Sequence, residues 1–243
     1  MKMKHTLLFI ISFFVCASLF AQNNPTINDT VPTTDVYGLR VGTDLVKIGR
    51  SLFEENYTGF EIQGDLRISK KFYLAAELGN ESNVWEEAYV SAKASGNYGK
   101  FGFDFNAYEN WKGMDNAISI GFRYGFSTFK QEMLHYRVYT TNPIFPSEPV
   151  YNSAEFTGLN AHWTELIVSV KAEVLKNIYL SLNVQLKLSI SEKAPDNFAN
   201  LYVPGFNRTY DFSNFGVGYG YSISYRIPLL KKKRTAAISG EED

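Results

Sequence analysis

Hydrophobic and polar residues alternate with a period of two along eight stretches of this chain. In the last of them, residues 214–229, bulky apolar or aromatic side chains occupy every odd position from Phe215 to Ile227. Glycine, serine or arginine occupies the even positions between them. This period is that of a β-strand with one apolar face and one small or polar face. The stretch is longer than the about 9 to 11 tilted strand residues that cross a bilayer.

The other seven alternating stretches are residues 37–46, 58–69, 72–80, 88–106, 116–129, 162–175 and 178–191. Within 88–106 the apolar positions change parity between Tyr98 and Phe101. One extra residue in the strand restores a common face, so the pattern predicts a β-bulge near Gly99.

The connections between these stretches alternate in length. The short ones are residues 70–71, 107–115 and 176–177, and the longer ones are 47–57, 81–87, 130–161 and 192–213. Short periplasmic turns and longer outer loops are typical of outer-membrane barrels. The chain is therefore expected to be all-β, an eight-stranded antiparallel up-and-down transmembrane β-barrel with both ends on the periplasmic side.

The bulk of the apolar faces indicates which side meets lipid. Eight strands enclose only enough space for side chains, and the apolar faces are too large to fit inside. The opposite faces carry many glycines, among them Gly216, Gly218 and Gly220. We therefore expect Tyr219, Tyr221 and Tyr225 to face lipid and the glycines to face the lumen. A soluble lipocalin-like barrel has the reverse arrangement.

Charges on the glycine-rich faces nearly cancel, as a tight lumen requires. Arg226 is expected to find an acidic partner near the periplasmic end. The expected lumen charges are the acids Asp44, Glu61, Asp65, Glu77, Asp104, Glu165 and Glu173 and the bases Arg40, Arg67, Arg123, Lys171, Lys187 and Arg226.

The chain begins with Lys2, Lys4 and an apolar segment, which is the pattern of a secretory signal peptide over residues 1–21. Its cleavage position stays open. Polar residues 22–36 are interpreted as a flexible periplasmic lead-in, 37–230 as the barrel and 231–243 as a periplasmic tail. The predicted location is the outer membrane. Whether Asp29-Thr30-Val31 is an O-glycosylation site is left open.

Composition narrows the classes of function. Cys16 falls in the signal peptide, so the mature chain has no disulfide. Removing Lys2 and Lys4 from 24 basic residues leaves 22 against 25 acidic residues, which argues against nucleic-acid binding. The glycines at 216, 218 and 220 lie inside a strand and open no helix, unlike a dinucleotide site. No metal, cofactor-binding or catalytic residues are predicted.

Several segments together resemble a known family: YGLRVGTDL (37–45), YLAAELGNE (73–81), YENWKGM (108–114), GFRYGFSTF (121–129) and LYVPGFNRTYDFSNFGVGYGY (201–221). They resemble the Bacteroidota family known as domain of unknown function 6048, over nearly all of the mature chain. The resemblance implies an outer-membrane β-barrel. It implies no activity and no site residues.

The aromatic-rich outer loops 130–161 and 192–213 are the main functional feature. Rigid scaffolds commonly present functional loops, so we expect a non-enzymatic barrel that is structural or binds an extracellular ligand or protein. Its other expected partner is outer-membrane lipid. Two alternatives stay open: a narrow or gated pore, and a rim-located lipid or acyl hydrolase using His162, three residues from Glu165. The oligomeric state and the ligand stay open as well.

Overall fold

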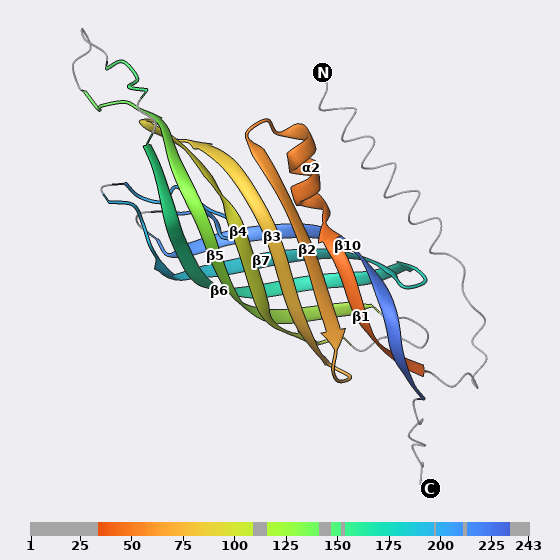
Figure 1. Cartoon of the computed structure of the whole chain (residues 1–243). Helices are drawn as coiled ribbons and strands as arrows, with labels where there is room; N and C mark the ends of the chain where they lie inside the picture. The colour runs from red at the N-terminus through yellow and green to blue at the C-terminus, as the bar shows by residue number, and fades with distance from the viewer. Residues whose placement is uncertain are drawn as a thin grey trace, which may run out of the picture. The chain divides into compact units, whose positions relative to one another are not determined.

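Figure 1 shows the computed structural model, which describes residues 34–108, 116–140, 147–151, 154–196, 198–210 and 213–233. Eight antiparallel strands form a closed barrel in the order β1-β10-β7-β6-β5-β4-β3-β2. This confirms the predicted fold. Their bounds are β1 Thr34–Asp44, β2 Tyr57–Arg67, β3 Phe72–Glu86, β4 Val90–Asn106, β5 Ala117–Tyr136, β6 Ala154–Leu175, β7 Ile178–Glu192 and β10 Phe215–Lys233.

The first and last strands close the barrel. β1 pairs with β10 from Thr34 opposite Lys233 to Asp44 opposite Ser222, so both chain ends leave the barrel at one rim. Strand pairing thus extends three residues into each of the segments 22–36 and 231–243. The division into signal peptide, lead-in, barrel and tail stays a prediction, since residues 1–33 and 234–243 lie outside the described residues.

The outer surface of the barrel is apolar, and the small residues face inward. Val217 and Tyr219 are each 73% exposed, whereas Gly216, Gly218 and Gly220 are buried. Comparable exposed apolar side chains lie on all eight barrel strands. A continuous apolar belt of this extent is unfavourable in water and is typical of transmembrane barrels. The predicted direction of the two faces is confirmed. None of the described helices is long and apolar enough to cross a membrane.

The predicted β-bulge near Gly99 was wrong. Gly99 pairs with Leu78 on β3 and Phe126 on β5 in unbroken register, and the shift in β4 falls between Ser91 and Ala92. The parity change has another cause: Tyr98 faces the interior although it is aromatic. Its hydroxyl donates a 2.6 Å hydrogen bond to Glu61 Oε2, which satisfies its polar end inside the barrel.

The predicted outer loops 81–87 and 130–161 are shorter than expected. β3 continues to Glu86, β5 continues to Tyr136 and β6 begins at Ala154, which leaves residues 87–89 and 137–153 as connections. Tyr136 at the outer end of β5 still pairs with Val90 of β4, and β5 and β6 continue together beyond the end of β7, where Glu192 pairs with Ala161. Beyond the apolar belt neither face needs apolar residues, so alternation disappears while backbone pairing continues.

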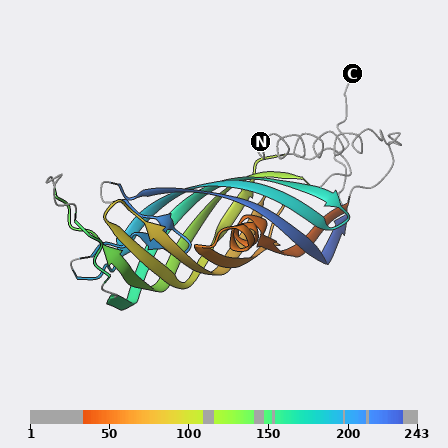
Figure 2. The same ribbon diagram turned by 90° about the horizontal axis from the view of Figure 1, so that it is seen from above.

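The first strand ends two residues before the predicted end at residue 46, because a helix follows Asp44. Helix α2 spans Leu45–Phe53. The Asp44 carboxylate accepts hydrogen bonds from the backbone N–H groups of Val46 and Lys47, at 2.7 and 3.1 Å, as an N-cap does. Seen from above, α2 lies in the barrel wall between β2 and β10 (Figure 2).

Candidate functional site

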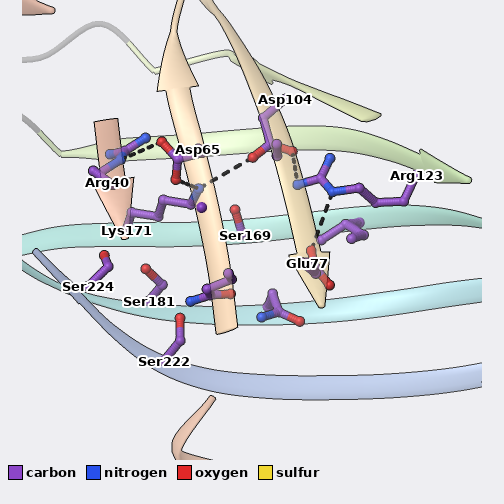
Figure 3. Close-up of a pocket in the computed structure, with 15 residues that line it drawn as sticks. Arg40, Asp65, Glu77, Asp104, Arg123, Ser169, Lys171, Ser181, Ser222 and Ser224 are labelled. Carbon is purple, nitrogen blue, oxygen red and sulfur yellow. Dashed lines mark hydrogen bonds and ion pairs between the residues drawn. The ribbon is translucent and has the colours of Figure 1, made fainter. Parts of the chain in front are cut away.

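A network of ion pairs fills the end of the lumen nearest the short turns. Arg40 Nε lies 2.6 Å from Asp65 Oδ1, and Lys171 Nζ bridges Asp65 and Asp104 at 3.0 and 3.3 Å (Figure 3). Arg123 continues the network, with Nη2 2.8 Å from Asp104 Oδ1. Alternation of cation and anion offsets the cost of desolvating these groups.

Lys100 joins this network to the middle of the lumen. Its ammonium group lies 3.0 Å from Glu77, 3.5 Å from Glu165 and 3.8 Å from Glu61. Glu77 in turn meets Arg123 at 3.3 Å, and Glu165 meets Lys187 at 3.6 Å. Lys100 is 3% exposed, so a charged side chain occupies the place where a pore would pass.

A polar cavity of about 40 Å³ lies within this network. It lies among the charges of Figure 3 and a row of serines, which are Ser169, Ser181, Ser222 and Ser224. A cavity needs at least about 10 to 15 Å³ of such volume to hold one water. The cavity therefore has room for only a few waters, and its polar lining suits hydration.

Arg226 lies at the end of the lumen nearest the short turns, as predicted. Its Nη2 lies 3.3 Å from Glu173 Oε1 and 3.1 Å from the Asn177 side-chain oxygen. Three further lumen charges, Lys47, Glu81 and Lys100, were not predicted from the sequence. Glu77 and Glu81 both occupy odd positions of β3, which face the lumen. Extending this alternation past the predicted strand end at residue 80 would have identified Glu81 as a lumen charge.

A hairpin closes the outer mouth of the barrel. It consists of β8 (Tyr202–Val203) and β9 (Asn207–Arg208) and lies in the connection 193–214 between β7 and β10. We call residues 198–210 the plug. Tyr202, Val203 and Phe206 of the plug are buried, and the Phe206 ring packs edge-on against Trp163 at 6.0 Å. Two aromatic residues of the predicted outer loop 192–213, Tyr202 and Phe206, thus close the lumen, whereas Tyr210 is 38% exposed.

Glu81 anchors the plug. Its Oε2 accepts hydrogen bonds of 2.9 Å from both the Tyr202 hydroxyl and the Gly205 backbone N–H. Its Oε1 accepts from Tyr57 at 3.1 Å and forms an ion pair with Lys47 of α2. Two parts of the outer end, the plug and α2, therefore meet at one buried carboxylate.

Two further lumen side chains hold the plug. Lys187 Nζ donates a 2.7 Å hydrogen bond to the Gly205 carbonyl. Gln131 donates to the Ala199 carbonyl at 2.9 Å and accepts from the Leu201 N–H at 3.2 Å. The plug is therefore bonded to β3, β5 and β7, and its contacts are those of a packed core.

The outermost described surface carries exposed aromatic residues. We call Tyr89, Val138, Tyr139, Val150 and Tyr151 the rim cluster; they come from the β3–β4 and β5–β6 connections. Tyr139 and Tyr151 are 65% and 78% exposed. Tyr89 packs edge-on against Tyr139 at 5.5 Å, and Tyr151 lies 5.5 Å from His135.

His162 and Glu165 do not come together. The His162 imidazole lies on the outer surface, with Nδ1 2.9 Å from the Tyr124 hydroxyl. Glu165 points into the lumen, where Trp163 and Lys187 contact it. The barrel wall separates the two side chains. Glu165 therefore cannot orient His162 as the general base of a hydrolase.

Metal binding finds no support in the part of the chain that the structure describes. There, no three His, Cys, Asp or Glu side chains gather as a set of metal ligands. The lumen carboxylates instead have lysine and arginine partners.

Solved structures with a related arrangement include that of Ail, the attachment invasion locus protein of Yersinia pestis. That structure is 9% identical, with a TM-score of 0.41, and the match covers 81% of this chain and 100% of that one. The complex of Ail with the heparin analogue sucrose octasulfate matches over the same shares at 10% identity and a TM-score of 0.38. No curated protein matches the chain. The model of the family described as "Domain of unknown function (DUF6048)" matches residues 2–232, and the chain belongs to that family.

Proposed function

We propose that this chain is a closed, non-catalytic barrel of the outer membrane that presents its rim cluster to an extracellular partner. The observation that carries the proposal is the contrast between the two outer connections. The plug buries Tyr202 and Phe206 in the barrel mouth, while the rim cluster exposes Tyr139 and Tyr151. Exposed aromatic residues on a rigid support are favourable anchors for a partner.

The filled lumen supports a binding role over transport. Lys100, Trp163 and Lys187 are almost completely buried across the middle of the barrel. Eight-stranded barrels have interiors that side chains fill, whereas porins of 16 strands contain water channels. We expect no ion conductance above background when the purified protein is added to a planar bilayer.

Membrane location is tested first. The apolar belt supports membrane insertion. The short turns lie at the same rim as Thr34 and Lys233, which supports a periplasmic position for the start of β1 and the end of β10. Outer-membrane fractionation should recover the protein, and protease added to intact cells should cut within residues 137–153. Cleavage after Lys233 in intact cells, with 137–153 protected, would show the opposite orientation.

The binding role is tested with a triple variant, Tyr89→Ser, Tyr139→Ser and Tyr151→Ser. Cells carrying it should lose adhesion to immobilised mucin glycans, purified envelope polysaccharide or extracellular-matrix protein, whichever the wild type binds. The matched control replaces three exposed lipid-facing residues, Phe101→Leu, Phe103→Leu and Phe122→Leu, and should keep adhesion. Equal adhesion of wild type and the rim variant on every surface would leave only a structural role.

A further inference from the structure

The barrel wall lacks part of one strand. β1 stays paired to β10 only as far as Asp44, opposite Ser222, and to β2 only as far as Thr43, opposite Ile62. β10 continues outward through residues 215–221 and β2 through residues 57–61. Helix α2 lies between these two strand extensions (Figures 1 and 2).

The gap lies within the apolar belt. On one side of it Phe60 of β2 is exposed, and on the other side Phe215, Val217 and Tyr219 of β10 are exposed. Helix α2 is amphipathic: Leu45, Ile48 and Leu52 recur at helical spacing on one face, and Lys47, Arg50 and Ser51 lie on the other. Leu52 is exposed, and Lys47 reaches into the lumen. The helix therefore replaces a strand with the same apolar-out and polar-in arrangement.

The helix is fastened on one side only. Ser51 Oγ accepts a 2.7 Å hydrogen bond from the Gly59 N–H of β2 and lies 2.9 Å from the Gly59 carbonyl oxygen. Lys47 pairs with Glu61 of β2 at 3.7 Å. On the other side, no hydrogen bond between described residues joins α2 to residues 215–221 of β10.

A cleft of about 370 Å³ occupies this unfastened side. Val184, Val217 and Tyr219, which face outward, line its outer part, and lumen-facing side chains line its inner part. The inner lining includes Lys47, Arg50, Lys100 and Lys187 against two acids, Asp44 and Glu61. The cleft thus changes from apolar to charged as it passes through the wall. Lys47, Lys100 and Lys187 have carboxylate partners in the lumen, whereas Arg50 pairs with the half-exposed Glu54 outside that network.

These features favour a membrane lipid, with an apolar chain and a polar headgroup, as the molecule that occupies the cleft. The outer part of the cleft opens within the apolar belt, where lipid is the surrounding medium. A strand edge such as residues 215–221 is unfavourable in hydrocarbon unless its backbone groups are satisfied. A headgroup supplies the hydrogen-bonding atoms that an acyl chain lacks. Of the cations that line the cleft, Arg50 is the one best suited to a phosphate. Among the described residues its ion-pair partner is Glu54, which is half exposed, and its guanidinium group lies 3.7 Å from the centre of the Tyr57 ring.

We propose that the cleft between α2 and β10 binds a phosphorylated lipid from the bilayer. Its phosphate lies toward Arg50 and Lys47, and its acyl chain lies over Val217 and Tyr219. This inference rests on the membrane insertion proposed above. It is independent of the rim cluster and of any extracellular partner.

The experiment uses the full mature chain in detergent micelles, with valine methyl groups observed by NMR. Titration with 1-palmitoyl lysophosphatidate should shift the methyl signals of Val46, Val184 and Val217 saturably. Methyl signals of Val168 and Val170, exposed on β6, report general lipid contact. Equal, unsaturable shifts at all five positions would mean annular lipid only and would overturn the proposal.

Two further probes separate the headgroup from the chain. Palmitoylglycerol, which lacks the phosphate, should bind at least about tenfold more weakly, since a charge-assisted contact is worth more than about 1.4 kcal/mol. Inorganic phosphate alone should not shift Val217 because it brings no acyl chain. Equal binding of the phosphorylated and neutral lipids would refute the assigned role of the basic lining.

Two variants test the location. Arg50→Gln should weaken lysophosphatidate binding about tenfold, whereas Lys130→Gln, which removes another rim cation paired to an exposed carboxylate, should not. Gly218→Val should fill the cleft, since its new Cβ atom would lie 2.7 Å from Gln185 Oε1 and 3.1 Å from Lys187 Cε. If Gly218→Val does not fold by heat-modifiable gel mobility, Arg50→Gln decides. Unchanged affinity in Arg50→Gln overturns the proposal.

Failure of membrane insertion has a different signature. In nanodiscs, Val168 and Val170 should show contacts to lipid acyl chains whether or not the cleft binds. Absence of these contacts would disprove insertion. Their presence without saturable shifts at Val184 and Val217 would disprove the cleft alone.

Discussion

The Glu81 carboxylate accepts a 2.9 Å hydrogen bond from the backbone N–H of Gly205, 124 residues later in the chain. Glu81 is fully buried on β3, and Gly205 is the turn of the plug. The same carboxylate pairs with Lys47 of α2. One buried charge therefore holds together the two elements that close the outer half of the barrel.

Replacing Glu81 should release the plug. Glu81→Ala removes the acceptor for Tyr202 and Gly205 and leaves Lys47 without its closest carboxylate. Loss of one partner of a buried ion pair costs about 3 to 5 kcal/mol. We expect residues 198–210 to become sensitive to protease and to lose amide protection from hydrogen exchange. Glu155→Ala breaks an exposed pair with Lys130 and should leave the plug protected. Equal protection in Glu81→Ala would refute the anchoring role.

Gly205 is the second point at which the plug is vulnerable. Its φ is +83°, and a Cβ atom there would lie 2.6 Å from Tyr98 Cγ. Gly158 has a similar φ of +70° but no atom within 4 Å of its added Cβ. Gly158→Ala should therefore cost only the left-handed backbone penalty, about 1 to 2 kcal/mol. Gly205→Ala should cost about 1 to 3 kcal/mol more. Urea unfolding in lipid vesicles measures both, and equal losses would contradict the close contact.

Lys100 should be the most sensitive charge of the lumen. Lys100→Met leaves Glu61, Glu77 and Glu165 without their shared cation, which we expect to cost about 3 to 5 kcal/mol. The double variant Lys100→Met with Glu165→Gln should recover part of this loss, because it removes one uncompensated charge and keeps an acceptor for Trp163. The temperature at which the folded gel band disappears reports the effect. No recovery in the double variant would argue against charge as the cause.

Docking of the plug should weaken at alkaline pH. Burial, with Glu81 adding to it, raises the pKa of Tyr202 well above its ordinary 10.0. The neutral phenol therefore favours the docked plug at every pH below about 10. Above that pH a released Tyr202 ionises while the docked one does not, so docking weakens up to about tenfold per pH unit until the raised pKa is reached.

Hydrogen exchange of residues 198–210 between pH 9 and 11.5 measures this loss, after correction for the intrinsic exchange rate. Tyr202→Phe should show a shallower pH dependence. Tyr57 and Lys47 also contact Glu81, so the difference between wild type and variant is the informative quantity. Identical pH dependence in the two proteins would exclude Tyr202 as the cause.

Period-two alternation accounts for the parts of the structure that were predicted correctly. It placed Tyr219 outward and Gly218 inward, and it placed Arg226 in the lumen, where Glu173 meets it. The same rule separates His162 from Glu165, because residues three apart in a strand face opposite sides. Applied consistently, it also identifies Lys100 as a lumen charge and removes the need for a bulge at Gly99.

The sequence by itself determined a barrel of eight strands, an apolar exterior and a charge-matched interior, because each follows from local alternation and the limited volume inside eight strands. Only the tertiary structure decided that residues 198–210 fold back as a plug and that α2 replaces part of β1 in the wall. Both depend on contacts distant in sequence, such as Glu81 with Gly205 and Ser51 with Gly59. Polar side chains make these contacts at the outer rim. Backbone and side-chain hydrogen bonds there replace apolar burial and carry no periodic signal along the chain.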